Sequence, residues 1–158
     1  RAYLINHFLD QFKGTVYRQT MFAEFELAMG EMAERGECLT ADALCAKYHE
    51  LNKLYFGPDM VSDDGIALEW ARIPHFFYNY YVFQYATGFS AAVAIANRIL
   101  ELGEPAVKDY KKFLSGGSST DPISLLKIAG VDMSSPEPVN SALKLFGELG
   151  DELEQLML

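Results

Sequence analysis

Apolar side chains recur every three or four residues along most of the chain, and this spacing limits the fold more than any other feature of the sequence. Between residues 2 and 34 they stand at Leu4, Phe8, Phe12, Val16, Phe22, Phe25, Met29 and Met32. That period places them on one face of a helix, and no stretch shows the strict apolar–polar alternation of a half-buried strand. The 158 residues are enough for one domain with a core of its own. We therefore predict an all-α fold, a helical bundle in which residues 1–158 form a single domain.

Glycine, proline and capping residues divide this pattern into helices. The first helix is expected to end at Arg35-Gly36, with one interruption at Gly14. Thr40 is the predicted N-cap of a second helix, which Gly57-Pro58 closes. Residues 57–73 are expected to be a loop with a short extended or helical piece. The remaining helices are predicted to start at Pro74 (running to Leu102), Glu104-Pro105, Asp121-Pro122 and Ser135-Pro136.

The charge balance argues against two classes of partner. Thirteen Lys and Arg residues against 22 Asp and Glu residues give a net charge of −9 and a pI near 4.7. Charge of that sign repels phosphate backbones and anionic membrane surfaces. The densest basic run, Lys108, Lys111 and Lys112, forms no local exception. We therefore expect neither nucleic acid nor a membrane as a partner.

Two cysteines bear on the cellular compartment. Cys38 and Cys45 are seven residues apart, which on one helix separates them by about 10 Å, too far for a disulfide. Two free thiols fit the reducing cytoplasm, where we expect the protein. The chain begins at Arg1 in mid-pattern, without an initiator Met or the layout of a signal peptide, so we expect a further segment upstream.

No set of residues has the spacing of a metal site. The three histidines are His7, His49 and His75, and no two are four residues apart, as a helical zinc site requires. The stretch His49-Glu50-Leu51-Asn52-Lys53 imitates H-E-x-x-H but puts a cation where the second ligand belongs. We predict no metal ligand within this chain.

An unusual run of aromatic residues follows Pro74. On one continuous helix, at about 100° per residue, His75, Tyr78, Tyr81 and Tyr85 would share an arc of about 120°, while Tyr80 would point away. Phenols, with an ordinary pKa near 10, stay protonated at neutral pH and can donate to a developing oxyanion without adding a charge. A packed core shows the same kind of stripe, its hydroxyls bonded to carbonyl groups, and periodicity alone favours the core.

Three stretches of the sequence resemble one enzyme family. Residues 72–88 read Arg-Ile-Pro-His-Phe-Phe-Tyr-Asn-Tyr-Tyr-Val-Phe-Gln-Tyr-Ala-Thr-Gly and resemble the C-terminal signature of oligoendopeptidase F, a thimet-type zinc metallopeptidase. Residues 12–26 resemble the stretch that precedes this signature in the family. Residues 125–133, followed by Ser-Ser-Pro-Glu-Pro, resemble the stretch that follows it. The matches occur in the family's order and together cover essentially the whole chain.

The resemblance implies the C-terminal part of a larger, mostly helical metallopeptidase catalytic domain that hydrolyses short peptides in an enclosed channel. In that family a helical H-E-x-x-H and a further glutamate hold zinc, and the glutamate of the motif activates the attacking water. Those ligands are expected upstream of Arg1, in the rest of the peptidase chain, so this segment alone is expected to be inactive. Its implied catalytic residues are His75, Tyr78, Tyr81 and Tyr85, which would bind the substrate carbonyl and its tetrahedral oxyanion.

A second hypothesis stays open beside the peptidase. A free-standing helical module could hold a peptide or small ligand in the same aromatic groove without any chemistry. An H-E-x-x-H motif upstream in the intact gene product would favour the peptidase. An authentic start codon at residue 1 would favour the module.

Overall fold

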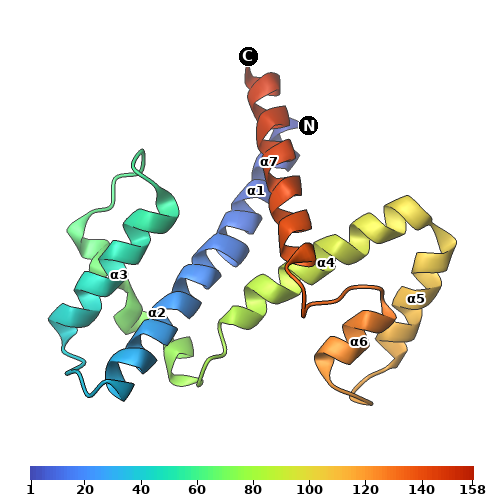
Figure 1. The fold of residues 1–158 in the computed structure, drawn as a ribbon. Helices are drawn as coiled ribbons and strands as arrows, with labels where there is room; N and C mark the ends of the chain where they lie inside the picture. The colour runs from blue at the N-terminus through green and yellow to red at the C-terminus, as the bar shows by residue number, and fades with distance from the viewer. The chain divides into compact units, whose positions relative to one another are not determined.

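The computed structural model describes all residues, Arg1–Leu158, and every regular element in it is helical (Figure 1). The all-α prediction is therefore confirmed. The chain packs into two compact units, one made of Arg1–Phe12 with Thr87–Leu158 and the other of Lys13–Ala86. The single-domain expectation stays a prediction. None of the helices is both long enough and apolar enough to cross a bilayer.

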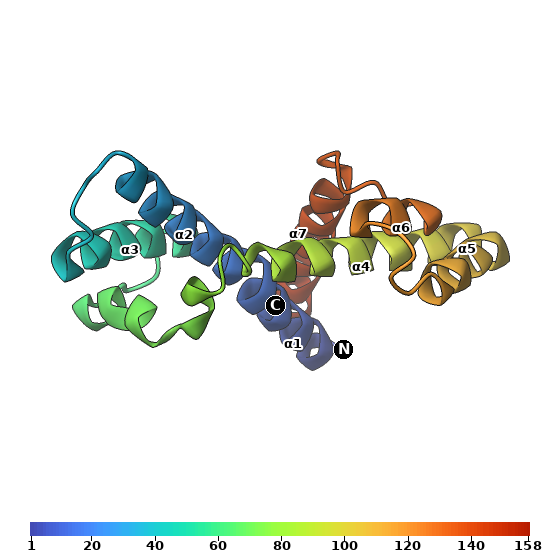
Figure 2. The same cartoon turned by 90° about the horizontal axis from the view of Figure 1, so that it is seen from below.

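The first unit contains one pair of neighbouring helices and a second group of three helices that share a small apolar core. Its elements are α1 (Ala2–Phe12), most of α4 (Phe83–Leu102), α5 (Glu104–Ser115), α6 (Pro122–Ile128) and α7 (Glu137–Met157). Helices α1 and α7 lie side by side (Figures 1 and 2). The ring of Phe12 packs between Phe89 and Phe146, with centroid distances of 5.3 and 4.8 Å. The contact with Phe146 and the salt bridge between Arg1 and Glu152 join the chain's N-terminal helix to its last one, and the contact with Phe89 joins it to α4.

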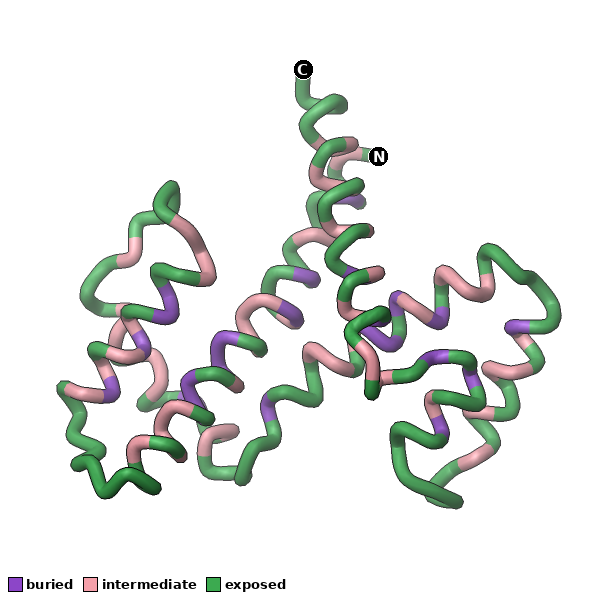
Figure 3. Tube along the Cα trace, in the orientation of Figure 1, coloured by how far each residue is buried: buried purple, intermediate pink, exposed green.

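The second unit carries the aromatic segment singled out in the sequence. Its elements are the π-helical turn η1 (Lys13–Tyr17), α2 (Arg18–Glu34), α3 (Ala41–Phe56), the 3₁₀ helices η2 (Asp64–Arg72) and η3 (Pro74–Phe77), and the first turn of α4. Helix α3 packs against both α2 and η2 (Figure 2). Buried positions recur along α2 and α3 (Figure 3). The buried core of this unit consists of Met21, Phe22, Phe25, Leu44, Tyr48, Leu51, Ile73 and Val82.

Local sequence signals fix most of the helix ends where they were predicted. The hydroxyl of Thr40 accepts the Ala43 amide at the start of α3, and the carboxylate of Asp121 accepts the Ser124 amide at the start of α6. Gly57 and Gly130 follow α3 and α6 with φ of 78° and 79°, the left-handed region that glycine enters without a steric penalty. Ile73, which precedes Pro74, is extended as expected.

One expectation about the helix ends was wrong in detail, and another is confirmed. The serine at position 135 does not cap α7, because its hydroxyl donates to the carbonyl of Asp132 and the helix begins one residue later, with Pro136 at its N-cap. The expected interruption near Gly14 is present, and it takes the form of the π-helical turn η1.

The long helix predicted from Pro74 to Leu102 was also wrong, since it is broken near its start. A four-residue 3₁₀ turn, η3, is followed by a bend at residues 78–82, and α4 begins only at Phe83. Aromatic and β-branched residues are weak helix formers because a helix restricts their χ1 angles, and they fill this stretch. Asn79 and Tyr80 leave the right-handed helical region altogether, with φ of 53° and 61°.

Candidate functional site

The bend gathers the four residues that the sequence grouped, although not on a single helix. The ring of His75 lies 5.5 Å from that of Tyr78, 5.9 Å from Tyr81 and 5.8 Å from Tyr85, between centroids. Tyr81 in turn lies 6.1 Å from Tyr78 and 5.6 Å from Tyr85. We call these four residues the His–Tyr cluster. His75 lies in η3, Tyr78 and Tyr81 in the bend and Tyr85 in the first turn of α4, so the cluster depends on the bend.

Two buried residues anchor the segment that carries the cluster, while the tyrosine side chains of the cluster are exposed in this chain. Ile73, which precedes η3, and Val82, the last residue of the bend, are both buried in the core of the second unit. The three tyrosines are 57% (Tyr78), 38% (Tyr81) and 37% (Tyr85) exposed, so they are not core residues. Within this chain the rings form a surface of aromatic faces and polar tips, and their catalytic role stays a prediction.

The polar atoms of the cluster contact one another directly. His75 Nε2 and the Tyr85 hydroxyl are 3.1 Å apart, a hydrogen bond whose donor depends on the imidazole tautomer. Loss of hydration raises the pKa of Tyr85 above its ordinary value of 10.0, and the neighbouring Tyr81 and Tyr78 add to the effect. The Tyr85 phenol therefore stays protonated at neutral pH and keeps a hydrogen to donate.

Tyr80 takes a different place from its neighbours. Its backbone amide donates to Glu26 Oε1 of α2 at 2.7 Å, and its phenol lies against Gly30, one turn further along the same helix. The sequence had also turned Tyr80 away from the cluster, but its contacts with α2 were not foreseen. A signal for them exists, because Phe22, Glu26 and Gly30 follow one another at four-residue intervals, which places an acid and a glycine on the apolar face.

A network of charges holds the segment that leads to His75. Glu69 of η2 accepts hydrogen bonds from Arg18 and Arg72, and its second oxygen accepts the hydroxyl of Tyr48. Burial of Glu69 opposes its charge, but the Tyr48 hydrogen bond and the two guanidinium groups outweigh it and lower the pKa of the carboxyl. The network therefore ties η2 to α2 and α3 and fixes where η3 begins.

No residues of this chain are arranged as a metal site. No three His, Cys, Asp or Glu side chains lie close enough together to hold an ion. His7 pairs with Gln11, and His49 lies 3.2 Å from the carbonyl oxygen of Ser62. Zinc, which the sequence resemblance implied, does not fit the donors present in this chain.

Comparison with a solved structure places the helical arrangement among peptidases. The crystal structure of oligoendopeptidase-F from Enterococcus faecium superposes with a TM-score of 0.96 at 49% identity and covers 99% of this chain. The chain corresponds to 30% of that protein's length. This chain therefore shares its fold with part of that protein.

Sequence comparisons name the family. The model of Peptidase family M3 matches residues 1–145, and the chain therefore belongs to that family. Oligopeptidase PepF of Bacillus subtilis is 57% identical over 158 residues, which are all of this chain and 24% of the relative. The chromosomal oligoendopeptidase F of Lactococcus lactis subsp. cremoris is 46% identical over 157 residues, 26% of its length. The chain thus spans about a quarter of the curated relatives it matches.

Proposed function

We propose that this chain is part of a zinc metalloendopeptidase that hydrolyses short peptides, and that the His–Tyr cluster binds the substrate carbonyl and the oxyanion formed from it. The observation that carries the proposal is the convergence of one imidazole and three phenols on an exposed face of a peptidase-family fold. Zinc would be held by residues outside this chain and would supply activated water when bound. The substrates would be short peptides, in keeping with the names of the relatives.

The role of the cluster follows from the charge that develops during peptide hydrolysis. Attack on a peptide carbonyl converts a neutral oxygen into an oxyanion, so donors that already point at that oxygen favour the transition state over the ground state. Phenols suit this role because they donate a hydrogen bond without bringing a charge that would bind other anions.

The four residues make different contacts within the cluster, and we assign their roles from those contacts. The hydrogen bond between His75 Nε2 and Tyr85 orients both groups, while Tyr81 packs against both rings. Tyr78 is the most exposed of the three tyrosines and contacts His75 and Tyr81 from the outer side. We assign the oxyanion contact to a phenol or imidazole of this group, with the remaining members fixing its direction.

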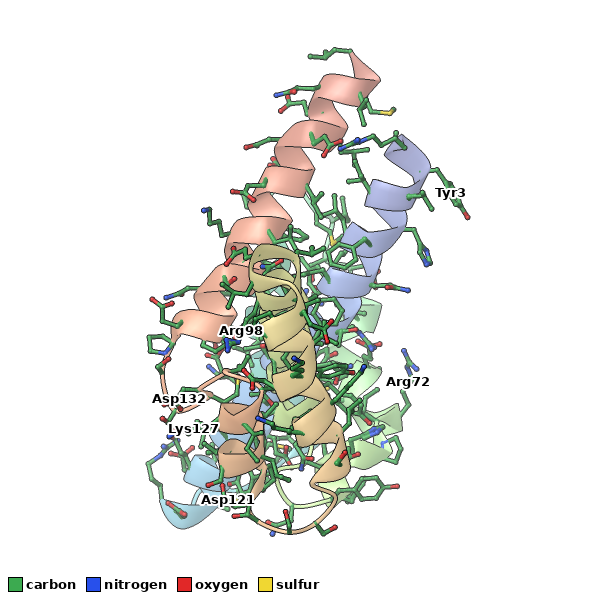
Figure 4. The ribbon with its side chains drawn as sticks, turned by 90° about the vertical axis from the view of Figure 1, so that its right-hand side faces the viewer. Tyr3, Arg72, Arg98, Asp121, Lys127 and Asp132 are labelled. Atoms are coloured by element: carbon green, nitrogen blue, oxygen red, sulfur yellow. The ribbon has the colours of Figure 1, made fainter.

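Kinetics on the full-length protein with added zinc and a quenched fluorescent peptide would test the proposal. We expect kcat to fall by a factor of about 10²–10³ in at least one of His75→Ala, Tyr81→Phe and Tyr85→Phe, with unchanged circular dichroism. Tyr3→Phe is a matched control, since this phenol extends from α1 into solvent (Figure 4) and is 80% exposed. If the three cluster variants cleave as fast as wild type, the cluster is scaffold.

We further propose a cytoplasmic location for the whole protein. Cys38 is an exposed free thiol and Cys45 a half-buried one that accepts the Trp70 indole hydrogen at 3.4 Å. Free thiols of this kind persist in a reducing compartment. Fractionation of cells that produce the full-length protein would test this, and recovery outside the cytoplasm would refute it.

A further inference from the structure

The bend that forms the His–Tyr cluster contains two residues in an unfavourable backbone conformation. Asn79 and Tyr80 are the two non-glycine residues of the chain with positive φ, at 53° and 61°. The left-handed region costs roughly 1–2 kcal/mol for a residue with a side chain, less for asparagine than for tyrosine. Such a conformation persists where its surroundings impose it, and it is often found at functional sites.

The two strained residues lie between the halves of the cluster. Tyr78 comes directly before them and Tyr81 directly after, and both rings contact His75. A helix continued through this point would keep φ negative at both residues and would place Tyr81 and Tyr85 differently relative to His75. The left-handed pair therefore sets the direction in which the phenols of Tyr81 and Tyr85 approach the imidazole.

Tyr80 contacts α2 through both its backbone and its side chain. Glu26 is only 6% exposed, and its Oε1 accepts the Tyr80 amide hydrogen at 2.7 Å. Acidic side chains are rarely buried without a partner, and a hydrogen bond to an ionised acceptor is among the strong ones. The contact joins residues 54 positions apart in the sequence, so it is a tertiary constraint and not local turn chemistry.

Gly30 makes the second contact between α2 and Tyr80. A Cβ atom at this position would collide with the Tyr80 hydroxyl, although it would lie at an ordinary 3.4 Å from the ring carbon Cζ. The φ of Gly30 is not positive, so glycine is required here for space and not for backbone conformation. Glu26 and Gly30, one turn apart on α2, thus receive the amide and the ring of a single residue.

We propose that Glu26 and Gly30 are positioning residues for peptide hydrolysis, which hold Tyr80 in its left-handed conformation and so keep the hydroxyls of the His–Tyr cluster aimed at one point. This inference rests on the proposed function of the cluster. Neither residue touches substrate. A misplacement of about 1 Å in a catalytic group can cost roughly a hundredfold in rate. A small movement of Tyr80 away from Glu26 and Gly30 should therefore produce a measurable loss of kcat.

The first experiment uses the full-length peptidase with zinc. We expect Glu26→Ala to lower kcat at least about tenfold with little change in KM, since the loss concerns the transition state. Glu26→Gln keeps an oxygen that accepts the amide, so most of the activity should return. Equal losses in both variants, or a change in KM alone, would overturn the proposal.

A second pair of variants separates positioning from general damage to α2. Gly30→Ala should lower kcat because the new methyl group displaces the Tyr80 hydroxyl. In a Tyr80→Phe background that hydroxyl is gone and the backbone amide remains, so the same Gly30→Ala change should cost less than about twofold. If Gly30→Ala is equally harmful in both backgrounds, the close approach of Tyr80 is not what matters.

A spectroscopic readout keeps the inference independent of catalysis. With 3-fluorotyrosine at position 81 of the full-length protein, Glu26→Ala should shift or broaden the fluorine resonance, and Glu26→Gln should leave it near the wild-type position. A shift without loss of activity would uphold the positioning and refute the role of the cluster. An unchanged resonance, together with loss of activity in Tyr81→Phe, would uphold the cluster and refute the positioning.

Discussion

The phenolic hydroxyl of Tyr48 donates to Oε2 of Glu69 at 2.5 Å, although Tyr48 is completely buried in α3 and Glu69 belongs to the 3₁₀ helix η2. The other carboxylate oxygen, Oε1, is shared by Arg18 and Arg72. A single carboxylate therefore fastens η2 to two helices of the second unit. Since η2 leads directly into Ile73 and Pro74, this contact determines where the His–Tyr cluster begins.

Tyr48→Phe should destabilise the second unit by about 1.5–3 kcal/mol, the usual worth of a hydrogen bond to a charged group. The ring is retained, so packing against Phe25 is unchanged and the effect isolates the hydroxyl. Hydrogen exchange of backbone amides, followed by mass spectrometry, should show faster opening in peptides from α3 and η2. Tyr55→Phe is the control, because its hydroxyl donates to Glu24 at an exposed site and should matter less. Equal effects of the two variants would contradict the argument.

The lowered pKa of Glu69 predicts how the second unit responds to acid. The folded state binds the proton of this carboxyl less tightly than the unfolded state, whose pKa lies near the ordinary 4.5. Its contribution to the free energy of unfolding is therefore complete above about pH 4.5 and disappears as the pH falls through the folded pKa. Urea unfolding between about pH 3 and pH 7 should show this loss in wild type. The slope should be smaller in Glu69→Gln, and identical slopes would refute the assignment.

Helix ends were predictable because their causes are local. Thr40 and Asp121 cap helices through amides three residues away, and the extended Ile73 follows from the proline after it. The break at residues 78–82 combines a local factor, the weak helix formers that fill it, with a long-range one, the hydrogen bond between Glu26 and the Tyr80 amide, which helical periodicity within this stretch does not show. Helical periodicity therefore predicted that His75, Tyr78, Tyr81 and Tyr85 lie together, as they do in the structure. The continuous helix on which that prediction relied is absent.

Thr40→Ala should weaken the start of α3 by about 1 kcal/mol, since it removes the acceptor of the Ala43 amide hydrogen. Thr40→Ser keeps a hydroxyl in the same place and should retain most of the stability. Hydrogen exchange at the first turn of α3 would compare the two variants. Equal exchange rates in alanine and serine variants would mean that water replaces the cap without cost.

Gly130→Ala should destabilise the first unit by about 2–4 kcal/mol, for two separable reasons. Gly130 has a φ of 79°, so any side chain is strained there. Its new methyl group would also collide with the guanidinium of Arg98 (Figure 4), which donates to the Ala129 carbonyl at 3.2 Å and to Asp109 at 3.0 Å. Those bonds connect α4 with α5 and with the end of α6.

Two comparisons divide the loss at Gly130 into its parts. Gly36 has a nearly equal φ of 74°, and no neighbouring atom lies within 4 Å of the place that a methyl group would take, so Gly36→Ala measures the backbone strain alone. That strain should cost about 1–2 kcal/mol.

In an Arg98→Ala background, Gly130→Ala should cost only that same amount, because the guanidinium it would displace is gone. Free energies of opening from hydrogen exchange across α4 to α6 would measure the change at Gly130, and the same measurement at the end of α2 would measure that at Gly36. If Gly130→Ala costs the same with and without Arg98, the close approach of the guanidinium contributes nothing, and backbone strain explains why glycine stands at this position.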